Sequence, residues 1–217
     1  MTWFSRPPIR SPFAAGPSMA AAPEDGVFRI LTVCTGNICR SAWAHHVLQT
    51  RLDDSVGPGR VEVSSAGVAP NQALRVPQEL LDLAPDEELR ARLAAHRPRP
   101  LSARSLSGQN LVLAATGAHL DAVFREAPAL LHRSATLLDA GALLSGADVA
   151  PSGGASAVKD ALRAGRAAGR GLPRAEADLP DPFRGPAEGY GHMVQALEPA
   201  LSAVVATLVR AIDAPGA

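Results

Sequence analysis

The sequence contains few of the residues that build disulfide-linked, membrane-spanning or nucleic-acid-binding proteins. Only two of the 217 residues are cysteine, which excludes a framework of several disulfides and favours a reduced, cytoplasmic setting. Lysine plus arginine and aspartate plus glutamate both number 21, and this zero net charge argues against nucleic acid as a partner. The sequence shows no continuous apolar run of membrane-spanning length, so we also expect no membrane partner.

Aromatic residues make up only 4% of the chain, whereas hydrophobic residues make up 47%, so we expect a core of leucine, valine and alanine. The length suits one domain with extensions, which we predict over residues 26–213. Residues 1–25 are broken by several prolines and lack the apolar region of a signal peptide, which indicates a disordered leader. Residues 146–179 are rich in alanine, glycine and arginine, and we predict an insertion or mobile loop there. Within it, residues 157–168 could form a helix with little apolar surface to bury.

Strand-like and helix-like patterns alternate along the rest of the chain. The expected strands are residues 27–33, 61–64, 111–115 and 134–138. The expected helices are residues 40–52, 77–83, 86–95, 119–126 and an amphipathic C-terminal helix over 187–212. This alternation predicts an α/β three-layer sandwich, with a four-stranded parallel sheet covered by helices on both faces. Ligands of such sheets bind beyond the carboxyl ends of the strands.

The loop between the first strand and the first helix carries the strongest chemical signal. It holds a cysteine, Cys34, and an arginine, Arg40, with five residues between them. Backbone N–H groups and the dipole of the following helix make such a loop an anion site. A thiol held there ionises readily because the same potential stabilises the thiolate. The planar fork of Arg40 can bind two phosphate oxygens at once. The loop therefore offers a nucleophile and a phosphate cradle together.

Three neighbours strengthen this interpretation. Gly36 and Asn37 tolerate the positive φ that a tight anion-binding loop often requires. The hydroxyl of Ser41 could hydrogen-bond the sulfur of Cys34 and stabilise the thiolate. The alternative is a buried structural cysteine at the end of a strand, followed by a helix-capping loop.

Phosphoryl transfer from an ester also requires a proton for the departing oxygen, and Asp181 is the candidate donor. Prolines on both sides, Pro180 and Pro182, restrict its backbone and hold the carboxylate in one direction. Phe183 could form an apolar wall beside a substrate ring. By itself this segment is more typical of a turn, and it is the cysteine loop that makes a functional role the better interpretation.

The segment from Cys34 to Ser41, together with the distant Asp181-Pro182 pair, resembles the low-molecular-weight protein tyrosine phosphatase family. The resemblance implies a flavodoxin-like strand order and a phosphatase acting on a phosphorylated protein or small aryl phosphate. It also implies a monomer that needs no cofactor and no metal.

The resemblance further implies a role for each site residue. Cys34 would attack phosphorus to form a cysteinyl-phosphate, and Asp181 would protonate the leaving group and then activate water. Arg40 and the amides of the loop would bind the phosphoryl oxygens. The loop residues that would support binding are Thr35, Gly36, Asn37, Ile38, Cys39 and Ser41. In this family a cysteine at the place of Cys39 can form a reversible disulfide with the nucleophile, and simple packing is an equally good interpretation.

The chain departs from the family pattern at positions that affect substrate choice. Ala42 follows Ser41 where the family usually has proline. Phe183 is not followed by a second aromatic residue, a form similar to that of the arginine-phosphatase branch. That branch carries a threonine where Ile38 stands, so the apolar Ile38 favours the tyrosine type.

Other functions remain open at this stage. They are a protein arginine phosphatase, a thiol-linked arsenate reductase, a non-catalytic phosphate-binding regulator, and a dithiol redox protein using Cys34 and Cys39. Six histidines are scattered along the chain without metal-ligand spacing, and the adjacent His45 and His46 would point about 100° apart on a helix.

Overall fold

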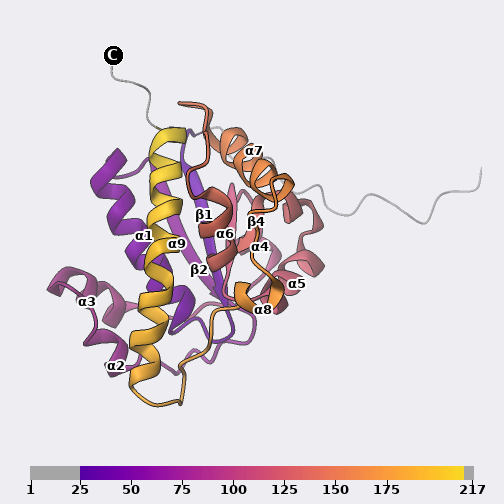
Figure 1. The fold of residues 1–217 in the computed structure, drawn as a ribbon. Helices are drawn as coiled ribbons and strands as arrows, with labels where there is room; N and C mark the ends of the chain where they lie inside the picture. Colours follow the sequence, from indigo (N-terminus) through magenta and orange to yellow (C-terminus); the bar gives the residue numbers. More distant parts are fainter. Residues whose placement is uncertain (1–24, 213–217) are drawn as a thin grey trace, which may run out of the picture.

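The computed structural model describes residues 25–212, and the predicted leader at residues 1–25 falls almost entirely outside this range. Four parallel strands form one central sheet in the order β2-β1-β3-β4. They are β1 (Phe28–Cys34), β2 (Val61–Gly67), β3 (Leu111–Ala114) and β4 (Ser134–Thr136). The parallel sheet and its flavodoxin-like order are as predicted, and Figure 1 shows the strands running side by side behind the helices.

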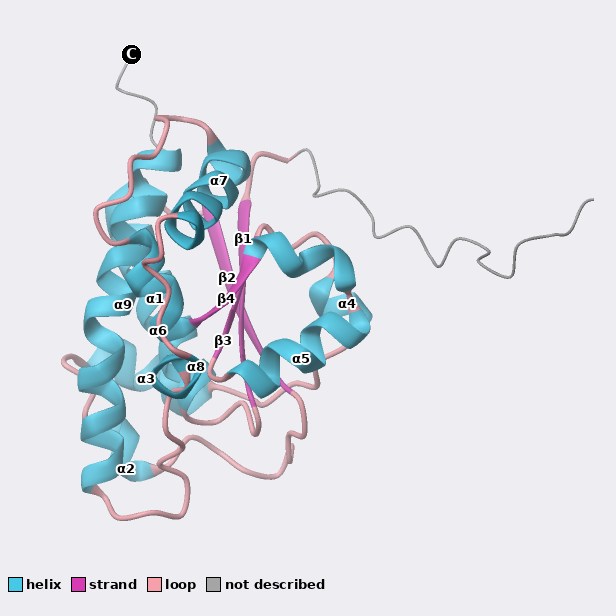
Figure 2. Cartoon of the chain, turned by 45° about the vertical axis from the view of Figure 1, so that its right-hand side comes forward, coloured by secondary structure: helices cyan, strands magenta, loops and turns pink. Residues whose placement is uncertain are grey.

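Helices cover both faces of this sheet. Figure 2 shows α1 (Arg40–Val56), α6 (Leu137–Leu144) and α9 (Glu188–Ile212) on one side, and α4 (Ala103–Leu106) and α5 (Gly117–Glu126) on the other. Alternate residues of β1 point to opposite faces. Phe28 and Ile30 join the core under α1 and α9, whereas Leu31 and Val33 join the core under α4 and α5. The strand is therefore apolar on both faces, as in a fully buried parallel strand.

Three further elements lie between the strands in the sequence. They are α2 (Gln78–Leu81), α3 (Glu87–Ala95) and a 3-10 helix, η1 (Pro128–Arg133). The second strand was expected to end at residue 64, and this is wrong because β2 continues through Gly67. The amide of Gly67 donates to the carbonyl of Arg99, and its carbonyl accepts from the amide of Leu101. Helix α4 was not predicted; its signal is a capping box made by Ser102 and Ser105.

Residues 146–179 contain the helix expected over residues 157–168 and one further short helix. They contain α7 (Gly154–Ala167) and α8 (Arg174–Ala177). Helix α7 buries Val158 and Leu162 in the core shared with α6 and α9, so the expectation of little apolar surface to bury is wrong. A Cβ atom at Gly165 would lie 2.6 Å from the carbonyl oxygen of Leu143, so glycine permits this close contact with α6. Whether the segment is an insertion stays a prediction.

Helix α9 crosses the same face as α1 and α6, and it continues through Pro199. Its buried stripe includes Met193, Leu197, Leu201, Val204 and Leu208. Among residues 25–212 it is the one helix that is long and apolar enough to cross a membrane. A helix that lines the core of a folded domain passes the same test, so this finding is weak evidence for a membrane span.

Candidate active site

The cysteine loop connects β1 to α1 at the carboxyl end of the sheet. Cys34 is the last residue of β1 and Arg40 is the first of α1, and both are buried. Asn37 sits between them with a φ of 55°, the left-handed conformation that the sequence predicted for this loop. The backbone N–H of Asn37 points at the sulfur of Cys34 at 3.2 Å. The loop thus wraps a backbone donor around the predicted nucleophile.

Side chains behind the loop form a chain of hydrogen bonds that ends at the sulfur. The Oγ of Ser41 lies 2.9 Å from the Sγ of Cys34. The Nδ2 of Asn37 donates to that Oγ at 3.0 Å, and the amide of Arg99 donates to the Oδ1 of Asn37 at 2.9 Å. Because Asn37 donates to the hydroxyl oxygen, the Ser41 proton is free to point at the sulfur, where it would stabilise a thiolate.

The backbone of the loop is also held from behind. The Nε2 of His96 lies 2.9 Å from the carbonyl oxygen of Asn37. A Cβ atom at Gly67 would lie 2.6 Å from the carbonyl oxygen of Thr35 and 3.1 Å from the Cβ of Asn37. Only a residue without a side chain lets β2 and the loop approach so closely. His96 and Gly67 were both missed as loop supports, because each is distant in sequence from the loop.

Arg40 reaches across the mouth of the loop to three partners. Its Nη1 donates to the carbonyl of Leu179 at 3.1 Å, and its Nη2 donates to the Oγ1 of Thr35 at 3.3 Å. The same Nη2 lies 2.7 Å from the Oδ2 of Asp181. Among the described residues the buried Nε of Arg40 has no hydrogen-bonding partner. This N–H is therefore available to an oxygen of a bound phosphoryl group.

Backbone contacts anchor the chain just before Asp181. The amide of Leu179 donates to the carbonyl of Ala115 at 2.8 Å, next to the end of β3. The Oδ1 of Asp178 accepts from the amide of Gly117 at 2.7 Å, at the N-terminus of α5. We expected an insertion or mobile loop over residues 146–179, just before Asp181. These contacts instead tie it to the sheet, with the carboxylate half exposed at the rim.

A pocket of about 140 Å³ opens above the loop. Its base contains Cys34, Thr35, Gly36, Cys39 and Arg40, and its rim carries Asp181. Its apolar side is formed by Ile38, Ala69, Leu74 and Phe183, and Asn71 adds an amide. Every predicted site residue lines this pocket except Asn37 and Ser41, which support the loop from behind. Ala69, Asn71 and Leu74 were missed because the segment after β2 carries no recognisable motif.

Two further groups near the loop are electrically neutral. Burial raises the pKa of the Cys39 thiol to about 12, and the neighbouring Cys34 acts in the same direction, so Cys39 stays protonated. Burial, aided by the Arg40 charge, lowers the pKa of His119 to about 4. The Nε2 of His119 lies 2.9 Å from the Oγ1 of Thr35, and its Nδ1 lies 2.7 Å from the Oγ1 of Thr116. His119 thus fixes Thr35 without adding charge.

Comparison with known proteins agrees with this geometry. The family model described as low molecular weight phosphotyrosine protein phosphatase matches residues 29–140. A low molecular weight protein-tyrosine-phosphatase from Streptomyces coelicolor is 27% identical over 86% of this chain and 96% of its own. A protein-arginine-phosphatase from Geobacillus stearothermophilus is 32% identical over 75% of this chain and 84% of its own.

Solved structures agree as well. The YwlE arginine phosphatase from Geobacillus stearothermophilus is 28% identical, with a TM-score of 0.56 over 83% of this chain and 92% of that one. The family match spans more than half of the chain and contains the whole cysteine loop, although it ends before Asp181. The chain therefore belongs to the low molecular weight phosphotyrosine protein phosphatase family, and it is a phosphatase.

Proposed function

We propose that the protein hydrolyses phosphotyrosine-type phosphomonoesters through a cysteinyl-phosphate on Cys34. The observation that carries this proposal is the meeting of Cys34, Arg40 and Asp181 at one pocket, with Arg40 and Asp181 2.7 Å apart. A phosphate-binding regulator would not require a carboxylate at the rim. A dithiol redox role for Cys34 and Cys39 would leave both Arg40 and Asp181 without a function.

In the first step the thiolate of Cys34 attacks phosphorus and the bond from phosphorus to the ester oxygen breaks. Asp181, as the carboxylic acid, gives its proton to that oxygen, so the product leaves as a neutral alcohol or phenol. The guanidinium of Arg40 and the N–H groups of the loop hold the phosphoryl oxygens and their developing charge. The phosphoryl group displaces the Asp181 side chain from Arg40 as it enters.

In the second step water attacks the phosphorus of the cysteinyl-phosphate. The Asp181 carboxylate takes a proton from that water, the bond between sulfur and phosphorus breaks, and Cys34 leaves as a thiolate. Its departure is eased by the Ser41 hydroxyl at 2.9 Å and the Asn37 amide at 3.2 Å. Inorganic phosphate is released, and Asp181 is again protonated for the next cycle.

The walls of the pocket favour an aryl phosphate. Ile38, Leu74 and Phe183 offer apolar surface to a ring, which suits a phenol leaving group. Among the pocket residues Asp181 is the single carboxylate, and the proposed chemistry already uses it. Two free thiols fit our inference of a cytoplasmic protein, because that compartment keeps thiols reduced. We also infer that the protein acts as a monomer.

A protein arginine phosphatase is the second candidate, because the curated relative with 32% identity carries that name. In that reaction the bond that breaks joins phosphorus to nitrogen, and Asp181 would protonate the departing guanidine. An assay of one phosphotyrosine and one phosphoarginine peptide of the same sequence separates the two candidates. Faster turnover of phosphotyrosine is expected from the apolar walls, and exclusive turnover of phosphoarginine would overturn the proposal.

The phosphatase proposal itself is tested with a simple aryl phosphate and no added metal. We expect Cys34→Ser to abolish hydrolysis and Asp181→Ala to reduce it strongly, with both variants still folded. Absence of wild-type hydrolysis between about pH 5 and 8, the range of a thiolate–carboxylic acid pair, would contradict the aryl-phosphatase reaction. Thiol-dependent reduction of arsenate by that protein would then favour the arsenate reductase alternative.

A further inference from the structure

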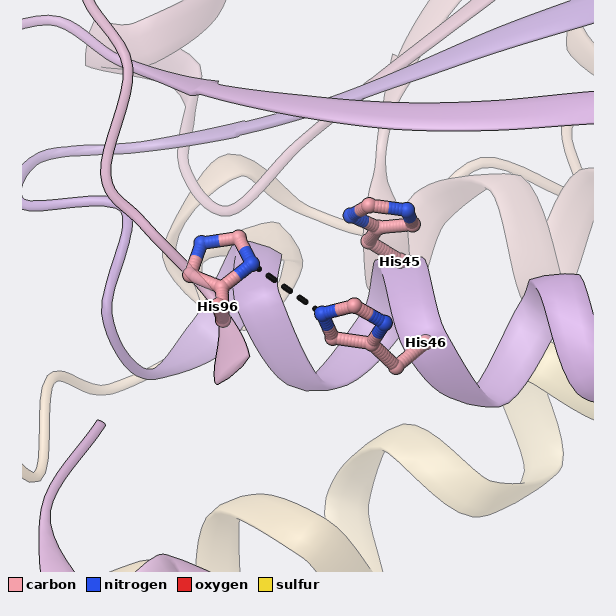
Figure 3. Close-up of side chains that lie close together, drawn as sticks. All are labelled: His45, His46 and His96. Carbon is pink, nitrogen blue, oxygen red and sulfur yellow. Dashed lines mark hydrogen bonds between the residues drawn. The ribbon is translucent and has the colours of Figure 1, made fainter. Parts of the chain in front are cut away.

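Three histidines that are scattered in the sequence gather behind the catalytic loop. His45 and His46 lie on α1, and His96 lies at the end of α3 (Figure 3). One ring nitrogen from each lies within 4.8 Å of the others. The rings of His45 and His46 do not diverge as expected for neighbours on a helix but stack with centroids 4.2 Å apart. The proposed phosphatase reaction gives this cluster no direct role.

The hydrogen bonds of His96 determine which of its nitrogens has a free lone pair. A carbonyl oxygen can only accept, so the Nε2 of His96 must donate its N–H to the carbonyl of Asn37. In the neutral ring the Nδ1 of His96 is then an acceptor, and it faces the Nε2 of His46 at 3.0 Å. The His46 nitrogen therefore donates, and one proton lies between the two rings.

We propose that His45, His46 and His96 bind one zinc ion, which takes the place of that proton. The proton moves from the Nε2 of His46 to the other nitrogen of that ring. The Nε2 of His46 and the Nδ1 of His96 then both direct a lone pair into the space between them. A zinc ion bound by three imidazoles keeps a fourth, tetrahedral position for water. Zinc–nitrogen bonds of about 2.0–2.1 Å require the three nitrogens to move closer together, which modest side-chain rotations would achieve.

Among the described residues, the rings of His45 and His96 each have an outer partner that would orient them as ligands. His96 donates to the carbonyl of Asn37, which is a common partner for the second nitrogen of a zinc-bound histidine. The Nδ1 of His45 lies 3.1 Å from the Oγ of Ser65. Zinc binding through the Nδ1 of His96 keeps the bond to Asn37, so the catalytic loop retains its support.

The surroundings keep the rings neutral and leave the cluster accessible to an ion from solvent. Burial lowers the pKa of His46 to about 4 and also lowers that of His96, so protons do not compete with zinc near neutral pH. His45 and His46 are half-buried, which leaves a path for the ion, whereas His96 is 8% exposed. The charges of Arg92 and Arg99 act on the cluster and oppose a cation, so we expect weaker binding than at a site with thiolate ligands.

The test uses zinc chloride and a full-length protein with Cys34→Ser and Cys39→Ser, because these thiols could themselves bind zinc. We expect calorimetry to give one zinc ion per chain, and added zinc to raise Tm until a chelator removes it. His46→Gln in the same background should weaken zinc binding about 10-fold or more. Loss of an outer partner of a ligand already weakens metal binding by about that factor, and loss of the ligand itself should weaken it at least as much. His132 is an exposed histidine outside the cluster, and His132→Gln should leave zinc binding unchanged.

Two results would overturn the proposal. One is the absence of saturable zinc binding in the thiol-free background, and the other is equal binding by that background and its His46→Gln form. If His46→Gln fails to fold by circular dichroism, His45→Gln provides the same comparison. Cobalt chloride gives a second readout, since ions held by three imidazoles should show the intense visible bands of a four-coordinate centre. Weak bands of a six-coordinate ion would also count against the site.

Discussion

The Oδ2 of Asp181 lies 2.7 Å from the Nη2 of Arg40, although 141 positions separate the two residues in the sequence. Arg40 is almost fully buried and Asp181 is about half exposed, so the carboxylate covers the guanidinium from the solvent side. A phosphoryl group that enters the loop must take this guanidinium from the carboxylate. The ion pair thus holds the proposed acid beside the phosphoryl-binding guanidinium before a substrate enters.

Replacement of Asp181 by asparagine should separate catalysis from phosphate binding. We expect kcat for an aryl phosphate with a poor leaving group to fall about 10²–10⁴-fold, because the amide cannot donate the required proton. Inhibition by inorganic phosphate should persist or strengthen, since a competing negative charge beside Arg40 is gone. Asp121→Asn, an exposed site, is the matched control. Unchanged turnover in Asp181→Asn would remove Asp181 from the mechanism.

Loss of the Ser41 hydroxyl should destabilise both the Cys34 thiolate and the conformation of the loop. Ser41→Ala removes the 2.9 Å contact with Cys34 and the acceptor for Asn37 at 3.0 Å. A hydrogen bond to a charged group contributes about 1.5–3 kcal/mol, so alkylation of Cys34 by iodoacetate and kcat should both slow by about 10–100-fold. Ser55→Ala, on the exposed part of α1, should change neither rate. Equal alkylation rates for Ser41→Ala and wild type would exclude this role.

A methyl group at Gly67 should disturb the loop, whereas one at Gly191 should not. The Cβ of Gly67→Ala would meet the backbone oxygen of Thr35 at 2.6 Å, which costs about 1–3 kcal/mol of stability and displaces the loop. Within residues 25–212, no neighbouring atom lies within 4 Å of a Cβ at Gly191 in α9, where alanine is favoured over glycine by about 0.5–1 kcal/mol. Urea unfolding should therefore show a lower free energy of unfolding for Gly67→Ala and a higher one for Gly191→Ala. Only Gly67→Ala should lose activity.

Stability should fall as the pH is lowered from about 6.5 to about 4. Burial lowers the pKa of both His46 and His119 from 6.5 to about 4 in the folded protein. Across this window the unfolded chain binds protons that the folded protein does not, so protonation favours unfolding. Urea unfolding at pH 7, 6 and 5 measures the slope. His46→Gln should make the free energy of unfolding depend less steeply on pH, while His132→Gln should not. Equal slopes for His46→Gln and wild type would contradict a contribution from His46.

The loop could be read from the sequence because its parts are adjacent. Cys34, Asn37, Arg40 and Ser41 lie within eight positions, and a strand before them and a helix after them orient them together. The strands of the sheet were likewise visible as short apolar runs. The composition of residues 146–179 was misleading, because small residues such as Gly165 allow close packing instead of preventing it.

The sequence alone determined the parallel α/β fold and the chemistry of the cysteine loop, since both depend on local order along the chain. Tertiary structure alone decided which distant groups meet that loop. Leu179 and Asp178 bind beside β3 and α5 and bring Asp181 to Arg40, and the end of α3 brings His96 to Asn37 and His46. Such contacts join groups far apart in sequence, and their geometry is fixed only when the layers pack.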